Sequence, residues 1–413
     1  MKKIFNNEND SVKKRAFLFI VLLGIISFFS DFTHEGARSI YGQYLSLIGV
    51  SAFLISTTAG LGEFIGQALR IVTGWIADKT GRYWFMMILG YAVNLLAIPL
   101  LGFVNESIWQ VAIVLILLER VGKAIRAPAK SALTSFTAPH LGAGKAFAIN
   151  EALDQAGAFL GPLIVFFILA DKTDNLLSGY HLAFFILGIF AVVTLLILFF
   201  AKTKYPKPQG FEEKSVTSQK FIFDRRFILY MMVISFIALG FIDYPVIAYH
   251  MGNYQLVDVL YIPLIYSAAM GIDAIAALIF GFMFDKIGIS SLLFSIGLSA
   301  LISPFVFLFE GQWALYIGIV LWGIGMGAQE SVLKAVVAKL VPKERRATGY
   351  GIFSSVFGLA WFLGSMVVGA LYTRSLSGMV IFTVVMQIMA FILLIILLKI
   401  KNNQNEIPIE NIS

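Results

Sequence analysis

The sequence predicts an all-α integral membrane protein with twelve transmembrane helices, arranged as two pseudo-symmetric bundles of six helices each. Three observations lead to this fold class. The composition is strongly apolar, with 59% hydrophobic and 13% charged residues. Twelve apolar runs are long enough to cross a bilayer, whose ~30 Å core needs about 20 residues per helix. Each half of the chain contains one copy of a short loop, and the two copies have the same glycine–aspartate–glycine spacing.

The composition also excludes several classes of protein. Soluble domains carry about 25% charged residues, well above the fraction in this chain. The chain has no cysteine, which excludes disulfides, thiolate metal sites and cysteine nucleophiles. The net charge of +7 does not indicate nucleic acid binding, because Lys and Arg gather at the ends of the apolar runs. We expect no cofactor and no enzymatic activity, because no catalytic triad or nucleotide-binding loop can be argued.

The apolar runs divide the chain into two halves with a hydrophilic linker between them. The basic N-terminal segment leads into the first run without a convincing cleavage site, so we expect an uncleaved first helix rather than a signal peptide. Residues 1–201 form the first predicted bundle, residues 202–226 the linker, and residues 227–413 the second bundle with its tail. The predicted spans are, in order, 16–42, 50–73, 84–103, 109–136, 146–170, 180–201, 227–250, 257–280, 289–309, 313–338, 348–373 and 378–398.

The distribution of basic residues predicts the orientation in the membrane. With the N-terminus in the cytoplasm, 22 of the 31 Lys and Arg residues fall on cytoplasmic segments. Cytoplasmic loops of membrane proteins carry an excess of Lys and Arg. We therefore expect both termini in the cytoplasm.

A short loop motif repeats between the second and third predicted helices of each half. The segments "GWIADKTGR" and "GFMFDKIG" share their glycine and aspartate spacing. Glycine permits the tight turn that such a loop needs. Two parallel repeats with a substrate site at mid-membrane between them are typical of secondary transporters. The motif residues are Gly74, Asp78, Gly81 and Arg82 in the first copy and Gly281, Asp285 and Gly288 in the second.

The first copy of this loop resembles the signature loop of the major facilitator superfamily. The resemblance covers nearly the whole chain and implies the major facilitator fold with alternating access. It also implies that contacts of the loop hold the cytoplasmic side closed and break as the two halves move. The chain departs from the family pattern at Tyr83, where a further basic residue often stands, and the second copy lacks the arginine. The alternative is a plain cytoplasmic loop, basic because of topology alone.

Ionisable residues inside the predicted helices are the candidate functional residues. A charge in a membrane helix costs about 2.5–3.5 kcal/mol on insertion scales and therefore usually faces a cavity or a partner. Most of these charges lie in the first half, where they share helix faces at about 100° per residue. The candidates for the substrate and proton pathway are Asp31, Glu35, Arg38, Glu63, Arg70, Arg120, Lys123, Glu151 and Asp154.

Two carboxylates of the first helix are the favoured proton carriers. Burial disfavours an ionised carboxyl group and a neighbouring arginine favours it, so a carboxylate that alternately pairs with an arginine can bind and release a proton. We favour Asp31 and Glu35, because they share a face with Arg38. A neutralising pair that only fixes helix packing is the alternative role for Glu63 and Arg70.

The fourth predicted helix carries a run of basic residues with two expected roles. Arg120 and Lys123 lie deep in the helix and are the better candidates for an anion-binding cavity. Arg126 and Lys130 approach the cytoplasmic end, where snorkelling and topology account for them without a substrate. In the second half, Glu330 and Lys334 have the spacing of a structural ion pair on one helix.

The sequence thus predicts a proton-coupled secondary transporter of a small polar or anionic solute. Its expected partners are that solute, protons and the lipid bilayer, and we expect a monomer. The segment "GKAIRAPAKSAL" resembles bacterial permeases of the same superfamily, which implies a bacterial inner membrane. One alternative is a drug–proton antiporter, because the segment "GAFLGP" partly resembles the fifth-helix motif of such antiporters. The other alternative is a membrane sensor or scaffold that does not transport. We expect no metal, although Asp31, His34 and Glu35 offer suitable ligand types.

Overall fold

The computed structural model describes residues 2–136, 143–171, 175–206, 224–341 and 346–400. Most of the predicted linker, residues 202–226, lies outside the described residues. The regular elements of the described residues are all helical. We call α1 to α7 the first half and α8 to α16 the second half.

The first half contains six long helices. Two short 3-10 turns, η1 (Leu101–Phe103) and η2 (Glu106–Ile108), connect the third of these helices to the fourth. The long helices are α1 (Lys2–Leu47), α2 (Ala52–Thr80), α3 (Tyr83–Leu100), α4 (Trp109–Ser135), α6 (Ala143–Ala170) and α7 (Leu176–Lys204).

The second half has the same number of spans, but three of them are interrupted. One predicted span is divided into α8 (Arg225–Leu239) and α9 (Tyr244–Asn253), because Asp243 begins a new helix by accepting a hydrogen bond from the Tyr244 N–H. The other elements are η4 (Val259–Tyr261), α10 (Ile262–Ile287), η5 (Gly288–Ser290), α11 (Ser291–Ala300), α12 (Ile302–Phe307), α13 (Gln312–Ala328), the π-helical segment η6 (Gln329–Leu333), α14 (Lys334–Leu340), α15 (Arg346–Arg374) and α16 (Leu376–Lys399).

The lengths of these helices agree with twelve spans. Nine described segments are long and apolar enough to cross a membrane, and one of them, Val259–Phe307, has 49 residues and holds both α10 and the α11–α12 span. Helices α2 and α4 have sufficient length, with 29 and 27 residues, but they carry many charges. With these two helices and the divided segment, the described residues are consistent with the predicted twelve spans.

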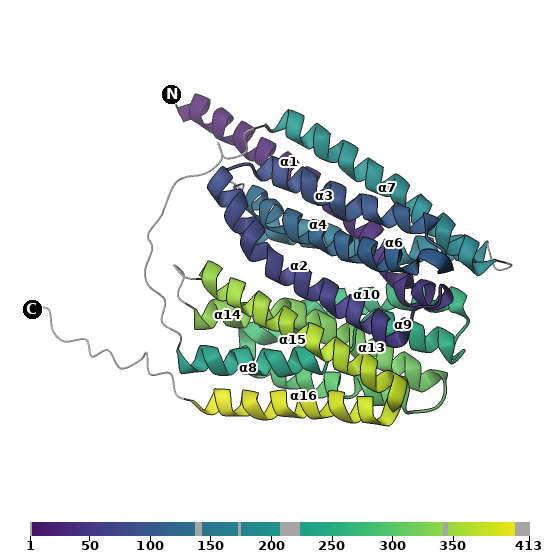
Figure 1. Cartoon of the computed structure of the whole chain (residues 1–413). Helices are drawn as coiled ribbons and strands as arrows, with labels where there is room; N and C mark the ends of the chain where they lie inside the picture. Colours follow the sequence, from purple (N-terminus) through teal and green to yellow (C-terminus); the bar gives the residue numbers. More distant parts are fainter. Residues whose placement is uncertain (1, 137–142, 172–174, 207–223, 342–345, 401–413) are drawn as a thin grey trace, which may run out of the picture.

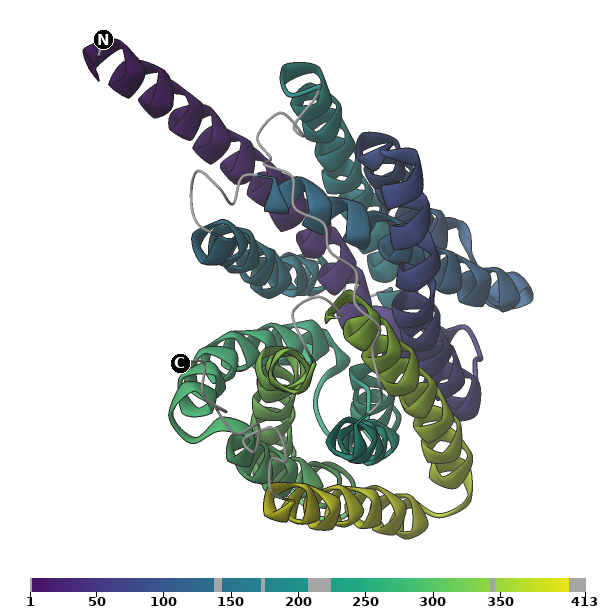
Figure 2. The same cartoon turned by 90° about the vertical axis from the view of Figure 1, so that its left-hand side faces the viewer.

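The helices lie roughly along one common direction. Figure 1 shows that α1 begins and α16 ends at the same side of the bundle, whereas α9 lies toward the opposite side. We call these the terminal side and the far side. Figure 2 views the bundle from the terminal side and shows the two halves as separate groups of helices, with α2 and α15 adjacent.

Four hydrogen bonds join the halves in the described part of the chain. Arg38 Nη2 donates to Asp243 Oδ1 at 2.8 Å, and Tyr266 Oη donates to Glu35 Oε2 at 2.5 Å. Two serine hydroxyls donate to carbonyl oxygens of the other half, from Ser56 to Ser365 and from Ser267 to Phe159. Each contact lies in the part of its helices nearer the far side, so these bonds hold the halves together there.

Candidate functional site

A polar cavity lies between the two halves. It consists of three adjoining lobes of about 210, 110 and 220 Å³, and Lys123 of α4 lines all three. We name them by the helix that distinguishes them. The α4 lobe lies between α1, α4 and α6, the α10 lobe adds residues of α10 and α13, and the α15 lobe reaches α2, α14 and α15. Together they form the central cavity.

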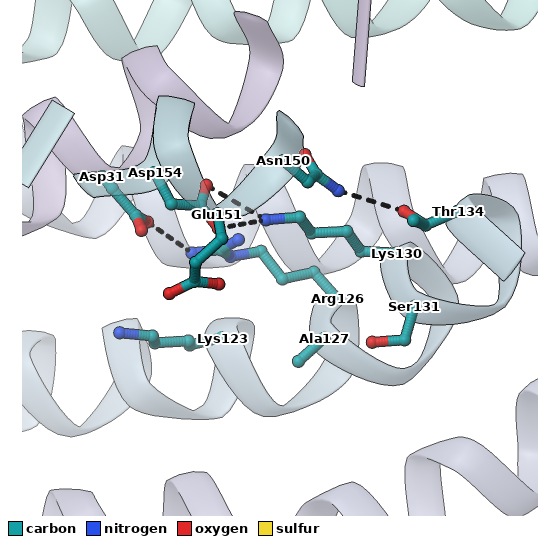
Figure 3. A pocket seen from close by; sticks show the side chains of 10 residues that line it. All are labelled: Asp31, Lys123, Arg126, Ala127, Lys130, Ser131, Thr134, Asn150, Glu151 and Asp154. Carbon is teal, nitrogen blue, oxygen red and sulfur yellow. Dashed lines mark hydrogen bonds and ion pairs between the residues drawn. The ribbon is translucent and has the colours of Figure 1, made fainter. Parts of the chain in front are cut away.

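The α4 lobe is formed entirely by the first half (Figure 3). Arg126 Nη2 lies 3.3 Å from Asp31 Oδ1, and Lys130 Nζ lies 2.8 Å from Asp154 Oδ2. Arg126 and Lys130 are therefore each neutralised by a carboxylate of another helix. Lys123 points into the same lobe, and it makes no ion pair with any described residue.

This geometry changes the interpretation of the basic run on α4. The sequence assigned Arg126 and Lys130 to interfacial anchoring, but both line the central cavity and pair with carboxylates. Arg126 is 3% exposed, and its guanidinium also lies 4.5 Å from the ring centroid of Tyr91. The partners come from α1, α3 and α6, so inspection of α4 alone could not identify them.

A second cluster of charged side chains lies nearer the far side, where α1 contacts the second half. Glu35 Oε2 accepts the hydrogen bond of Tyr266 and lies 3.5 Å from Arg38 Nη1. Arg38 in turn donates to Asp243. Two carboxylates from opposite halves thus share one guanidinium, which makes Glu35 and Arg38 sensitive to any relative movement of the halves. The sequence had placed Glu35 and Arg38 on one face, whereas their partners Asp243 and Tyr266 emerged only from the structure.

Behind Glu35, a buried network runs from α1 to α3 and α4. His34 is fully buried, with Nδ1 at 2.7 Å from Glu119 Oε1 and Nε2 at 3.4 Å from Glu35 Oε1. Glu119 also accepts a hydrogen bond from the Asn94 side chain. Because Asp31 pairs with Arg126 instead, the three side chains considered as metal ligands do not converge on one point. No group of three or more potential metal ligands occurs among the described residues.

The pair expected between Glu330 and Lys334, and the alternative pair between Glu63 and Arg70, are not formed in the described residues. Glu63 pairs with Arg120, whose Nη1 lies 3.2 Å from Glu63 Oε2, and the described residues show no ion pair between Glu63 and Arg70. Glu330 and Lys334 likewise form no ion pair in the described chain, although both line the α15 lobe. Glu330 lies in η6, where the π-helical turn replaces the α-helical spacing that brings residues four apart together.

The repeated loops lie at the terminal side, away from the central cavity. In the first copy, Gly81 ends α2 at φ +62°, and Asp78 accepts a hydrogen bond from the Tyr83 hydroxyl at 3.1 Å. Asp78 and Arg82 are exposed. In the second copy, Gly288 follows α10 at φ +62°, and Asp285 is exposed. Gly81 and Gly288 thus serve the predicted tight turns, whereas Gly74 and Gly281 lie inside α2 and α10 and do not form the turn.

All nine residues predicted for the substrate and proton pathway line the central cavity. Glu151 lines two lobes and is exposed to the cavity, and Arg70 lines the α15 lobe. The structure adds Asp273 and Glu330 from the second half, and three aromatic residues of α15. The aromatic residues carried no sequence signal, because lipid-facing and cavity-facing aromatics look alike in a membrane chain.

Comparisons with known proteins agree with this architecture. A family described as Major Facilitator Superfamily matches residues 20–310 and 244–411. An uncharacterized protein of Mycobacterium tuberculosis is 34% identical over 385 residues, which is 92% of each chain. An uncharacterized MFS-type transporter of Methanocaldococcus jannaschii is 28% identical over 400 residues, covering 94% of this chain and 96% of that one.

A solved structure supports the fold. The nucleoside transporter NupG superposes with a TM-score of 0.74 at 14% identity, covering 92% of this chain and all of that one. With the family match and the helix count, this similarity confirms the predicted fold class.

Proposed function

Because the chain belongs to the major facilitator superfamily, and is therefore a membrane transporter, we propose that it moves a small polar or anionic solute across the membrane by alternating access, coupled to protons. The observation that carries the proposal is the charged central cavity between two halves that are joined by hydrogen bonds toward the far side. A drug–proton antiporter for apolar compounds is less compatible with these charges.

Alternating access is supported by the position of the contacts between the halves. Glu35 and Arg38 line the central cavity, and their bonds to the second half lie in the part of α1 nearer the far side. We propose that the terminal side is cytoplasmic, that the membrane is a bacterial inner membrane, and that this structure corresponds to a form closed on the outside. Release of these bonds would open the far side as the loops at the terminal side close.

Proton coupling is assigned to Glu35. Its carboxylate accepts a hydrogen bond from Tyr266 of the second half, so movement of the halves removes that partner, and the same movement separates the neighbouring Arg38 from Asp243. Removing such partners favours the protonated form of a carboxyl group in a membrane interior. Glu35 would therefore bind a proton in one conformation and release it in the other.

The experiment is solute exchange in proteoliposomes that contain the full chain. Counterflow with a metabolite library identifies the solute, and uptake is then driven by an imposed pH gradient. We expect Glu35→Gln to retain counterflow and to lose uptake driven by the pH gradient. The matched control is Asp258→Asn, at an exposed aspartate near the far side, which should behave as the parent chain. Gradient-driven uptake by the Glu35→Gln variant would refute the assignment.

A further inference from the structure

The charges of the central cavity are separated by sign between two adjoining lobes. Six acidic and two basic residues line the α10 lobe, whereas three acidic and five basic residues line the α15 lobe. The two lobes share Glu35, Arg38, Lys123, Met326 and Glu330, so they form one continuous space. A single small molecule in this space meets an acidic wall at one end and a basic wall at the other.

An unpaired acceptor lies in the acidic lobe. Asp273 of α10 is 2% exposed, and its Oδ1 atom is buried and accepts no hydrogen bond from any described residue. Gly327 leaves the space that this carboxylate occupies, because a Cβ atom there would lie 2.9 Å from Asp273 Oδ1. A buried carboxylate oxygen without a donor is costly, since it loses its hydration and gains no partner.

Unpaired donors lie in the basic lobe. Arg70 Nε and Trp361 Nε1 are buried, and neither donates a hydrogen bond to a described residue. Both residues line the α15 lobe together with Lys123, which also makes no ion pair in the described chain. Buried N–H groups without an acceptor, on residues that line one space, are suited to bind an anionic oxygen.

The π-helical segment provides a further sign that this region serves binding. Glu330 lies in η6, and it lines both lobes at their junction. Single π turns inside α-helices occur often at functional sites, because the widened turn redirects a side chain at the cost of regular hydrogen bonding. Here the turn places a carboxylate beside Asp273 in the α10 lobe.

We infer that the solute is dipolar: a cationic group, such as an ammonium, binds at Asp273 and Glu330, and an anionic carboxylate or phosphate binds at Arg70, Lys123 and Trp361. This inference rests on the proposed transport function and narrows its substrate class. A solute with an anionic group alone would leave the Asp273 carboxylate unpaired. A cation alone would leave the donors of the α15 lobe unpaired.

The test measures equilibrium binding to the purified full chain, which does not require transport. The dipolar probes are glycine, γ-aminobutyrate, ε-aminohexanoate and ethanolamine phosphate, each compared with an analogue that lacks the amine and one that lacks the acid. For γ-aminobutyrate these analogues are pentanoate and butylamine. We expect at least one dipolar probe to bind about tenfold more tightly than both of its analogues, because each charged group adds a charge-assisted contact.

Two substitutions assign the ends of the solute. Asp273→Asn should weaken binding of the best dipolar probe about tenfold and leave the acid-only analogue unchanged. Trp361→Phe keeps an aromatic ring but removes the N–H, so it should weaken the dipolar and acid-only probes and leave the amine-only analogue unchanged. The control for both is Asp258→Asn. A preference for ethanolamine phosphate over the amino acids would assign the anionic group to phosphate, and the reverse to carboxylate.

Three outcomes would overturn the inference. They are dipolar probes that bind no better than their analogues, an Asp273→Asn variant with unchanged affinity for them, and a solute from counterflow that carries charge of one sign or none. In the last case the proposed transport function stands while the dipolar substrate class falls. If no solute exchanges in counterflow, the transport function fails, and the binding measurements still decide whether the cavity accepts dipolar molecules.

Discussion

The two halves have the same helix arrangement but different interiors. The second half packs around one continuous apolar cluster that includes Trp322, Tyr244 and Tyr266, all of them fully buried. The first half has two separate apolar clusters, one around Tyr44 toward the far side and one around Met87 toward the terminal side. Between these clusters lies a belt of ionisable residues contributed by α1, α2, α4 and α6.

This difference shows how a repeated fold can separate stability from chemistry. In the first half, a charge inside the membrane is tolerated because a partner of opposite sign lies on a neighbouring helix. The second half is held by apolar packing and adds a few polar groups at the interface, among them Asp243 and Asp273. The comparison predicts that the halves respond differently to loss of charge and to loss of apolar volume.

The largest effect is expected from breaking the ionic belt. Arg120 neutralises Glu63 at 3.2 Å and lies 3.4 Å from Glu119. Arg120→Met retains much of the side-chain volume but leaves two carboxylates without this cation, and removing one partner of a buried ion pair costs about 3–5 kcal/mol. Thermal unfolding in detergent should show a large fall in the midpoint.

A triple variant tests the cause of that fall. Replacing Glu63 and Glu119 by glutamine together with Arg120→Met removes the uncompensated charges. It should recover much of the lost stability, because the penalty comes from unpaired charge rather than from missing contacts. An equally unstable triple variant would show that the belt contributes through specific hydrogen bonds, as in the contact between Asn94 and Glu119.

A smaller effect is expected in the apolar half. Trp322 Nε1 donates to the Ile242 carbonyl at 2.9 Å, and its ring packs 5.4 Å from that of Tyr244. Trp322→Phe removes the donor and part of the ring, and a buried carbonyl left without a partner costs about 1–3 kcal/mol. The unfolding midpoint should fall by less than in Arg120→Met. A larger fall would mean that the second half is the less tolerant one.

The sequence predicted the architecture because that depends on properties of single segments. Apolar run length and the repeated loop are both local features, and they predicted the helices and the two halves. The nine predicted residues all line the central cavity, because a charge in a membrane helix is rare enough to be informative. Their partners were harder to predict: Arg126 meets Asp31 and Tyr91, and Glu63 meets Arg120 rather than Arg70.

Interruptions of the helices were also missed. The break before α9 has a local signal, because Asp243 caps the new helix and Pro245 lies in its first turn. The π turn at Glu330 depends on tertiary packing, which local propensity does not describe. The aromatic side of the α15 lobe was missed for a related reason. Nothing in the sequence separates Trp361, which faces the cavity, from Trp75, which is exposed at the surface.

A third prediction concerns the contact between the halves. Asp243→Asn keeps a side chain that can cap α9 but removes the charge that Arg38 meets at 2.8 Å. Loss of a charge-assisted hydrogen bond of about 1.5 kcal/mol would shift the ratio of closed to open far side about tenfold. Because the chain has no cysteine, Gln43→Cys provides a single label near Gly252 of the other half.

The measurement is the rate at which a membrane-impermeant maleimide labels that cysteine. We expect faster labelling in the Asp243→Asn background, because the far side opens more often. The matched control is Asp258→Asn combined with Gln43→Cys, because Asp258 is an aspartate of the second half whose side chain caps η4 within that half. Equal labelling in both backgrounds would show that apolar packing, rather than the charged contact, closes the far side.

The smallest effect compares the two repeated loops. Gly81 and Gly288 both have φ +62°, but ψ is +9° at Gly81 and −140° at Gly288. The first conformation is left-handed helical and costs an alanine about 1 kcal/mol, whereas the second is adopted almost only by glycine. Gly288→Ala should therefore lower the unfolding midpoint more than Gly81→Ala, by a difference of about 1 kcal/mol. Gly281→Ala serves as the control, because it has no positive φ and no atom lies within 4 Å of the added Cβ. Equal losses at Gly81 and Gly288 would mean that the loop of the second half relaxes to accept a side chain, and that the two copies of the motif differ in sequence but not in backbone constraint.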